Sequence, residues 1–155
     1  MPRVVGVAIV RLLTWADGMY CFDTDVLSAV LRRDPPLHLI RRLAQLPPTD
    51  QATTTINLGE LLYGAAKRGS ERLARRAREV VSSAAVVLPF DADAAEVYGP
   101  LRARLEREGR RLDEPDLRIA SIALSRGLVV VTGNVRHFAR VPGLEVENWL
   151  AGEQR

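Results

Sequence analysis

Residues 20–31 read YCFDTDVLSAVL, and this stretch decides how the chain begins to fold. The apolar run Tyr20–Phe22 is short enough for a buried strand, and it ends at an acid, Asp23. Apolar residues then recur at helical spacing from Val26 to Leu31, so we expect a helix to follow at once. A short, wholly apolar strand that runs into a helix is typical of a parallel α/β sheet.

The same alternation continues along the rest of the chain. Apolar or β-branched runs predict further strands at residues 53–55, 86–88, 128–131 and 144–146. Helical patterns lie at residues 37–46, 56–63, 70–82, 91–108 and 113–127, and Thr55 is the expected N-cap of the second of these. We therefore expect an α/β fold with a short, mostly parallel central sheet that is flanked by helices on both faces.

One domain accounts for most of the chain. A length of 155 residues is close to that of one ordinary domain, and no repeat or linker divides the sequence. We expect residues 19–150 to form this domain and residues 151–155 to be a C-terminal tail. A strand-like run begins at Met19, so residues 1–18 are either a native N-terminal extension or lie upstream of the true start.

Composition excludes several classes of protein. Apolar residues make up 47% and charged residues 26% of the chain, which is typical of a globular protein. The single cysteine, Cys21, excludes an intramolecular disulfide framework and a cysteine-based metal cage, and it favours a cytoplasmic location. No run reaches the roughly 18 apolar residues of a membrane span, so we expect no membrane association.

Positive charge is concentrated in two segments. The net charge is only +3, but residues 67–80 hold six basic and two acidic residues. Residues 102–111 hold five basic and two acidic residues. Such segments either bind phosphate groups or form the solvated outer faces of helices, and the sequence leaves both possibilities open.

Three acids stand in apolar surroundings, namely Asp23, Glu60 and Asp116. A buried carboxylate is costly on its own, and several that converge repel one another. A hard divalent cation with oxygen ligands, Mg²⁺ or Mn²⁺, relieves this repulsion. With a substrate phosphate as a further ligand, such a site can activate water, so these acids indicate phosphodiester hydrolysis.

Each of these acids also has a purely structural explanation. Asp23 or Asp25 could only cap the helix that follows, and Glu60 could bond a neighbouring helix or point to solvent. Asp116 lies in a first helical turn, where the helix dipole favours any acid. Cap and dipole positions alone account for Asp91, Asp93 and Asp113.

Four segments of the chain together resemble the PIN-domain ribonucleases, and in particular the VapC-type toxins of bacterial type II toxin–antitoxin modules. They are FDTDVLSAV (22–30), TTINLGELLYGA (54–65), DEPDLRIASIAL (113–124) and VVVTGNVRHFARVPGLEVENW (129–149). The resemblance covers residues 20–149. It implies a single PIN-like domain and a Mg²⁺- or Mn²⁺-dependent endoribonuclease activity.

The resemblance also assigns roles to individual residues. Asp23 is similar to the first metal-binding aspartate of the family, Glu60 to its helical glutamate and Asp116 to its third acid. Asn134 falls where many relatives carry a fourth acid, so the resemblance implies indirect or water-mediated metal binding there. The implied catalytic residues are these four, and the implied metal ligands are the three acids.

Two nearby residues depart from the family pattern, and they alter the charge expected at the site. Asp25 stands where the family often has asparagine, and His137 stands where a carboxylate is common. We expect His137 to pack beside Phe138 in preference to acting as a base. Three hydroxyl residues could support the ligands or a phosphate: Thr24, Ser28 and Thr132.

The resemblance implies three partners, namely structured RNA cleaved at exposed loops, a small VapB-like antitoxin and a second copy of the chain. Basic residues are available to hold an RNA backbone that bare carboxylates would repel. They are Arg32, Arg33, Lys67, Arg68, Arg75, Arg76 and Arg110. Aromatic residues make up only 5% of the chain, so we expect recognition by shape and phosphate more than by base stacking.

Two other functions compete with this interpretation. FDTDVL also resembles haloacid-dehalogenase-type phosphatases, in which Asp23 would be a nucleophile and Asp25 a general acid or base. That fold would need a later lysine, whereas the only lysine here is Lys67. A catalytically weak RNA- or antitoxin-binding module is the other alternative, because Asn134 removes one possible charge.

Overall fold

The computed structural model describes residues 18–84 and 86–152, so nearly all of the predicted extension, residues 1–18, lies outside the described residues. None of the helices in these ranges is long and apolar enough to cross a membrane. The elements are β1 (Tyr20–Phe22), α2 (Thr24–Val30), α3 (Leu37–Gln45), the 3-10 helix η1 (Pro48–Asp50), β2 (Gln51–Thr54), α4 (Thr55–Lys67), α5 (Glu71–Ser82), β3 (Val86–Leu88), α6 (Ala92–Arg107), α7 (Glu114–Arg126), β4 (Val129–Val131), α8 (Val135–Phe138) and β5 (Val146–Glu147).

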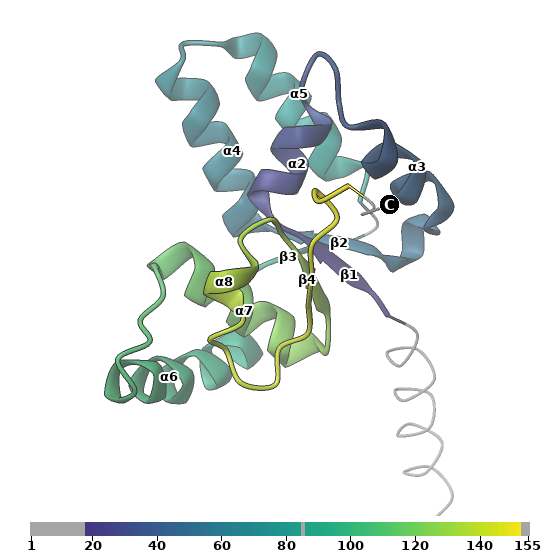
Figure 1. The fold of residues 1–155 in the computed structure, drawn as a ribbon. Coiled ribbons are helices and arrows are strands. Elements are labelled where there is room, and N and C mark those ends of the chain that lie inside the picture. The colour runs from purple at the N-terminus through teal and green to yellow at the C-terminus, as the bar shows by residue number, and fades with distance from the viewer. Residues whose placement is uncertain (1–17, 85, 153–155) are drawn as a thin grey trace, which may run out of the picture.

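Five short strands form one sheet in the order β3-β2-β1-β4-β5 (Figure 1). Every pairing is parallel, which confirms the predicted α/β class. In the centre of the sheet, Tyr20 of β1 is in register with Gln51 of β2 and with Val129 of β4. Because the strands are parallel, their carboxyl ends share one edge, which is where ligand sites of such sheets form.

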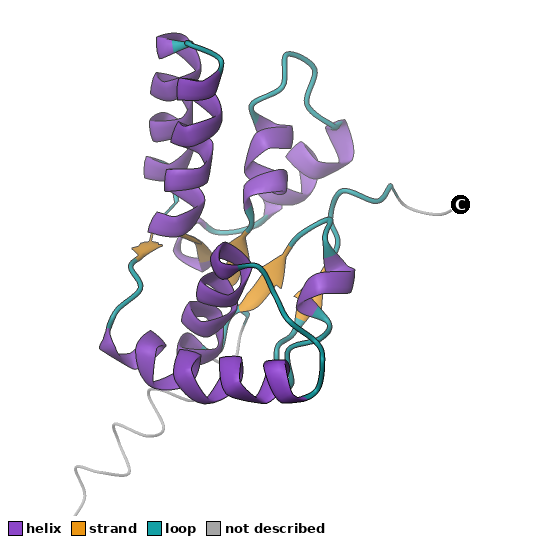
Figure 2. Cartoon of the chain, turned by 90° about the vertical axis from the view of Figure 1, so that its left-hand side faces the viewer, coloured by secondary structure: helices purple, strands orange, loops and turns teal. Residues whose placement is uncertain are grey.

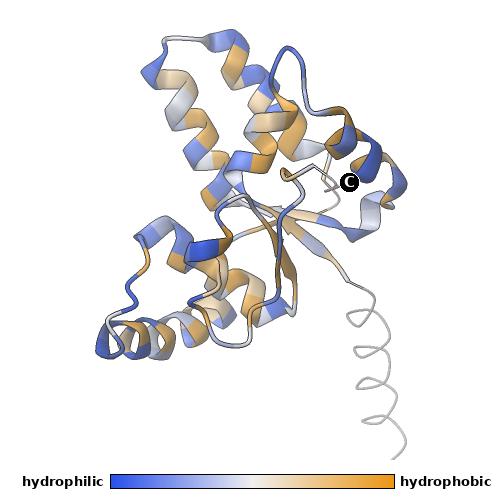
Figure 3. Cartoon of the chain, in the orientation of Figure 1, coloured by the Kyte–Doolittle hydropathy of each residue, from blue (hydrophilic) through white to orange (hydrophobic). Residues whose placement is uncertain are grey.

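Helices cover both faces of the sheet, as expected (Figure 2). Helices α2 to α5 pack on one face and α6 and α7 on the other, and we call these the α2–α5 layer and the α6–α7 layer. Successive residues of a strand point to opposite faces. Cys21 accordingly joins the α6–α7 core and Phe22 the α2–α5 core. Figure 3 shows hydrophobic residues in the strands and hydrophilic residues over the outer turns of α3 and α6.

The start of α4 differs from the sequence prediction. Strand β2 ends at Thr54, and Thr54, not Thr55, is the N-cap of the helix. The Asn57 backbone N–H donates to the Thr54 hydroxyl at 3.2 Å, and the Thr54 backbone N–H donates to Asn57 Oδ1 at 3.3 Å. This capping box needs a polar side chain three residues after the cap, and only Thr54 stands at that distance from Asn57.

The C-terminal elements also differ from the prediction. Strand β4 begins at Val129 instead of residue 128, and β5 is Val146–Glu147 instead of residues 144–146. The short helix α8 was not expected, because four residues are too few to show helical periodicity. Helix α8 follows directly after Asn134 and therefore fixes where that residue and His137 lie.

Candidate active site

The predicted site residues come from four segments that meet at the carboxyl edge of the sheet. Asp23 follows β1 and is the N-cap of α2, and its backbone N–H donates to the Val131 carbonyl of β4 at 3.0 Å. Glu60 lies on α4 and Asp116 in the first turn of α7. Asn134 follows β4. The parallel sheet thus explains why residues far apart in the sequence share one region.

Hydrogen bonds from three segments hold the Asp23 carboxylate in one orientation. Its Oδ1 accepts from the Thr24 backbone N–H at 2.8 Å and from the Asn57 side-chain amide at 3.0 Å. Its Oδ2 accepts from the Thr132 hydroxyl at 2.8 Å. Asp23 is only 6% exposed. The residue therefore caps its helix and is also fixed from α4 and from the loop after β4, which a cap alone would not require.

Glu60 is tied to Asp23 through two intermediate side chains. The Thr24 hydroxyl donates to Glu60 Oε1 at 3.1 Å. The same hydroxyl oxygen accepts from the Asn57 amide, also at 3.1 Å. Thr24 therefore plays the supporting part expected of it, whereas Asn57 was not singled out from the sequence. The sequence signal was the spacing of Thr54 and Asn57, because a threonine followed three residues later by an amide side chain is similar to a capping box.

Asp116 and Asn134 meet at His137. The Nδ1 atom of His137 lies 2.8 Å from the Asn134 side-chain nitrogen and 3.4 Å from Asp116 Oδ2. With Nδ1 unprotonated, the Asn134 amide donates to the ring, whereas a protonated Nδ1 can donate to Asp116. The expectation that His137 packs beside Phe138 is wrong, because Phe138 is fully buried while His137 turns toward the acids with 39% of its side chain exposed.

Asp25 fixes the loop that carries Asn134. Its Oδ2 accepts from the Gly133 backbone N–H at 2.8 Å. A Cβ at residue 133 would lie 2.7 Å from this oxygen and 2.9 Å from Leu150 Cδ1. Glycine is therefore required at this position because the α2 carboxylate approaches the backbone closely, a contact that the sequence analysis missed.

Burial raises the pKa of each of the four carboxyl groups in this region. For Asp23 the main cause is burial, and the negative charge of Asp116 adds to it, while hydrogen bonds from its three donors oppose the rise in pKa. For Asp116 burial is again the largest cause, and contact with His137 opposes it. Burial and the charge of Asp23 raise the pKa of both Glu60 and Asp25. A positive charge bound here would oppose these rises in pKa, because it favours the charged form of a carboxyl group.

The donor set suits a hard divalent cation in an open site. Within residues 18–84 and 86–152, no three acidic, histidine or cysteine side chains come close enough to enclose a metal ion. Mg²⁺, however, usually keeps several waters and binds through one or two carboxylates together with substrate phosphates. An oriented carboxylate with raised pKa and two further acids nearby is the kind of site that such an ion uses.

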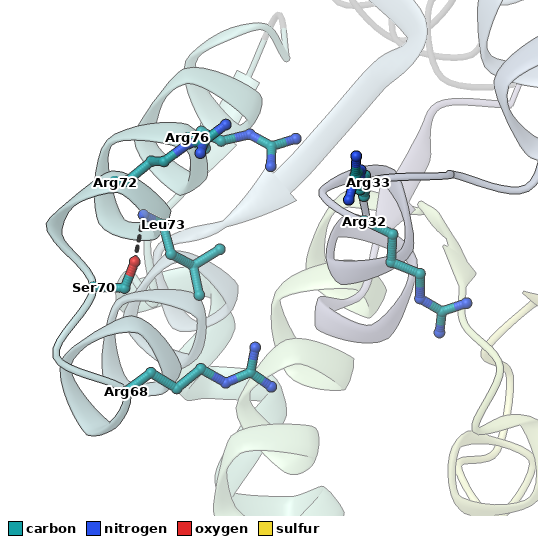
Figure 4. A pocket seen from close by; sticks show the side chains of 7 residues that line it. All are labelled: Arg32, Arg33, Arg68, Ser70, Arg72, Leu73 and Arg76. Carbon is teal, nitrogen blue, oxygen red and sulfur yellow. Dashed lines mark hydrogen bonds between the residues drawn. The ribbon is translucent and has the colours of Figure 1, made fainter.

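One of the acids, Glu60, lines a hollow of about 370 Å³, and this hollow shares Arg32 and Arg68 with a second one of about 690 Å³. Thr24, Ser28 and Glu60 line the smaller hollow, and support of a ligand by Ser28 stays a prediction. The larger hollow is lined by arginines, and Figure 4 shows their arrangement.

The basic residues expected beside the acids do not all lie there. Those that line the larger hollow are Arg32, Arg33, Arg68 and Arg76, together with Arg72, which was not among those expected. Those that line neither hollow are Lys67, Arg75 and Arg110. Arg72 and Arg76, which line the larger hollow, are four residues apart and share one face of α5.

Comparison with known proteins gives one consistent result. The chain matches the PIN domain family over residues 20–144. It is 36% identical over 130 residues to the tRNA(fMet)-specific endonuclease VapC of Salmonella typhimurium, covering 84% of this chain and 97% of that protein. It is 32% identical over 131 residues to Ribonuclease VapC2 of Haemophilus influenzae, covering 84% of this chain and 98% of that protein.

Solved structures are similar over the same part of the chain. One is VapBC2 from Rickettsia felis bound to a DNA fragment from its promoter, with a TM-score of 0.73, 30% identity and coverage of 84% of this chain and 98% of that one. Another is DNA-bound VapBC from Salmonella typhimurium, with a TM-score of 0.70, 34% identity and coverage of 85% and 98%.

Proposed function

The chain belongs to the PIN-domain family and, within it, to the VapC ribonucleases, and on this premise we propose that it hydrolyses RNA with a divalent cation, Mg²⁺ or Mn²⁺, which Asp23, Glu60 and Asp116 hold directly or through bound water. It is the ribonuclease toxin of a type II toxin–antitoxin system. The observation that carries the cation proposal is the buried, oriented Asp23 carboxylate, whose pKa is raised by burial and by the charge of Asp116.

The proposed roles follow from how each side chain is held. Asp23 is the fixed ligand, because Asn57 and Thr132 prevent its carboxylate from turning. Glu60 approaches from α4 and Asp116 from α7, so the acids face a phosphate from two sides. A divalent cation bound among them would activate water and stabilise the negative charge that develops on the phosphoryl oxygens.

Asn134 and His137 act, we propose, as positioning residues. The Asn134 amide contacts His137, and His137 contacts Asp116. Asn134 would therefore influence the cation through His137 or through a bridging water and not as a direct charged ligand. Its backbone N–H donates to the Thr132 hydroxyl at 3.0 Å, which links it to the Asp23 carboxylate as well.

The expected partners fit this function. We propose a small VapB-like antitoxin as the inhibitor, because the similar structures are VapBC complexes. A homodimer stays a prediction, which sedimentation of the purified chain would test. We further propose that the reaction takes place in the cytoplasm, since RNA is the substrate.

The family to which the chain belongs excludes one of the two competing functions and leaves the other open. Membership of the PIN-domain family removes the dehalogenase-type phosphatase. In addition, the Asp25 carboxylate that would act as its general acid or base accepts a hydrogen bond from the Gly133 N–H. The catalytically weak binding module is still an outcome that the following experiment decides.

Incubating the antitoxin-free protein with total RNA tests the proposal. Reactions contain Mg²⁺ or Mn²⁺, and parallel reactions contain EDTA or the Asp23→Asn variant. We expect discrete fragments that disappear in both controls. A folded wild-type protein that cleaves with neither metal, or that cleaves equally in EDTA, would overturn the cation proposal and favour the binding module.

A further inference from the structure

The larger hollow beside the acids is lined almost entirely by arginine. Its volume is about 690 Å³, and no acidic side chain is among the residues that line it. We call it the arginine hollow, and its lining residues are Arg32, Arg33, Arg68, Ser70, Arg72, Leu73 and Arg76. A surface of this composition, in a chain with a net charge of only +3, calls for an anionic occupant.

Three segments of the α2–α5 layer bring these arginines together. Arg32 and Arg33 follow the end of α2, Arg68 is the C-cap of α4, and Arg72 and Arg76 lie on α5. In Figure 4, the side chains of the α4 and α5 residues extend toward the end of α2. The hollow is therefore formed by the packing of these helices and not by one flexible loop.

These guanidinium groups have no ionic partner among the described residues. The salt bridges there involve other arginines, namely Arg42, Arg102, Arg104, Arg118 and Arg126. On α5, Arg72 and Arg76 are four residues apart, where like charges repel. The acids of that helix, Glu71 and Glu79, form no salt bridge with either arginine within the described residues. The hollow-facing arginines of α5 are therefore left without an ionic partner there.

The arginine hollow is continuous with the acid site. Arg32, Arg68 and Leu73 line both hollows, and the smaller hollow reaches Thr24 and Glu60. An occupant of both must therefore be an extended molecule with a bond to be cleaved at one end and negative charge farther along. A single-stranded RNA backbone, with one phosphate per nucleotide, has this character.

We propose that the arginine hollow binds the phosphates of the RNA strand that lie beyond the cleaved bond, on the side of α2, α4 and α5. This inference rests on the proposed function of the acid site. An acidic peptide would also be attracted, but the lining offers a peptide only Leu73 as an apolar contact, whereas guanidinium groups match phosphate oxygens in geometry.

Two double variants of α5 test the proposal, and both remove two positive charges from the same helix. R72Q/R76Q removes two arginines of the hollow, and R75Q/R78Q is the matched control, because neither of its arginines lines the hollow. Each protein is assayed on an oligoribonucleotide that spans a mapped cleavage site and on bis(4-nitrophenyl) phosphate, a phosphodiester too small to reach the hollow.

We expect R72Q/R76Q to raise the KM for the oligoribonucleotide roughly 10-fold and to leave kcat and the small substrate unchanged. The slope of log Kd against log salt, measured in EDTA, should fall by about 1.4, because each phosphate contact with a single strand contributes about 0.7. R75Q/R78Q should match the wild type. If R72Q/R76Q does not fold, R32Q/R33Q, which lies outside the helices, takes its place.

The outcomes separate this inference from the proposed function. If the wild type cleaves RNA but R72Q/R76Q matches R75Q/R78Q in KM and salt slope, the inference is wrong and the nuclease stands. If the wild type does not cleave RNA, but its slope of log Kd against log salt exceeds that of R72Q/R76Q by about 1.4, the nuclease proposal is wrong. The arginine hollow is then still an RNA-binding site. If R72Q/R76Q keeps its RNA affinity and loses affinity for the antitoxin, the hollow is a protein-binding site and the inference is overturned.

Discussion

The two arginine-rich segments of the chain have similar charge but opposite surroundings. In residues 102–111, Arg102 pairs with Glu106 at 3.0 Å and with Glu114 at 3.1 Å, and Arg104 pairs with Glu108 at 3.0 Å. In residues 67–80, the arginines that line the hollow have no such partner within the described parts of the chain. Net charge is therefore a poor guide to binding, and the spacing of acids around each arginine is a better one.

The same contrast applies to the acids. Near the carboxyl edge of the sheet, burial raises the pKa values of the carboxyl groups, among which we propose that a cation binds. In the α6–α7 layer, Asp91 caps α6 and pairs with Arg126, and Glu114 accepts from Tyr98 and from Arg118. The acids at the carboxyl edge are therefore available for a ligand, whereas Asp91 and Glu114 are neutralised by partners within the chain.

The largest expected effect is a loss of RNA cleavage, and we expect it for only one of two acids that stand two residues apart on α7. We expect Asp116→Asn to lower RNA cleavage by more than about 100-fold, because it removes a ligand of the proposed cation. Glu114→Gln should leave cleavage unchanged, because Glu114 contacts only Tyr98 and exposed arginines. Steady-state cleavage of one RNA by both variants measures this, and equal losses would remove the distinction between the two regions.

Two glycine substitutions should have effects of opposite sign. Gly133→Ala places a Cβ 2.7 Å from Asp25 Oδ2, so we expect a loss of about 1–3 kcal/mol in unfolding free energy together with lower activity. Gly59→Ala on α4 meets no atom within 4 Å and should stabilise the protein by roughly 0.5–1 kcal/mol. Urea unfolding and cleavage assays measure both variants. A neutral Gly133→Ala would show that the loop moves away from α2 without cost.

Stability should depend on pH in opposite directions in the two regions. The pKa of Asp23 is raised by burial, so the folded state holds its proton more tightly than the unfolded state, and the stabilisation present at low pH is lost as the pH rises through the raised pKa. Without divalent cations, Asp23→Asn should therefore melt at a higher temperature than the wild type at pH 7, and this gain should shrink in acid.

The contribution of Glu114 to stability depends on pH in the opposite direction. Hydrogen bonding from Tyr98 is the main cause that lowers its pKa, so its stabilising contribution is present above the unfolded pKa and is lost as the pH falls. Glu114→Gln should therefore melt below the wild type at pH 7, and the difference should shrink in acid. Thermal unfolding of both variants between about pH 2 and pH 7 checks this, because the contribution of Glu114 is lost only below its unfolded pKa of about 4.3. Adding Mn²⁺ at pH 7 should raise the melting temperature of the wild type but not that of Asp23→Asn.

The smallest effect is expected on the outer face of α6. Arg104→Gln removes an exposed pair with Glu108 and should change the unfolding free energy by no more than about 0.5 kcal/mol. It should leave the KM for RNA at its wild-type value. A rise in KM comparable to that of R72Q/R76Q would mean that RNA contacts both layers.

Much of the fold could be predicted because it depends on local patterns. Apolar runs and helical spacing gave the strands and most helices, and the Asp91 cap was also correct, since its carboxylate accepts from the Ala94 N–H. The cap of α4 was misplaced because three threonines in a row are equivalent until the partner is considered. Asn57, three residues after Thr54, decides between them.

The site was less predictable because it depends on contacts between distant segments. The sequence could propose that Asp23, Glu60 and Asp116 converge, but it could not show that Asp25 reaches Gly133 or that His137 lies between Asn134 and Asp116. The role of Arg72 was different, because its four-residue spacing from Arg76 was visible in the sequence. The number of charges in residues 67–80 does not show that spacing.

The order of the strands has a consequence for the timing of synthesis. Asp23 is held by Thr132, which is 109 residues later in the chain, and β1 pairs with β4 on one side. At about 5–20 residues per second, a ribosome needs roughly 5–20 s between these two residues. The contacts that orient the Asp23 carboxylate are therefore complete only after β4 and Thr132 have been made, so the proposed site is incomplete through most of translation.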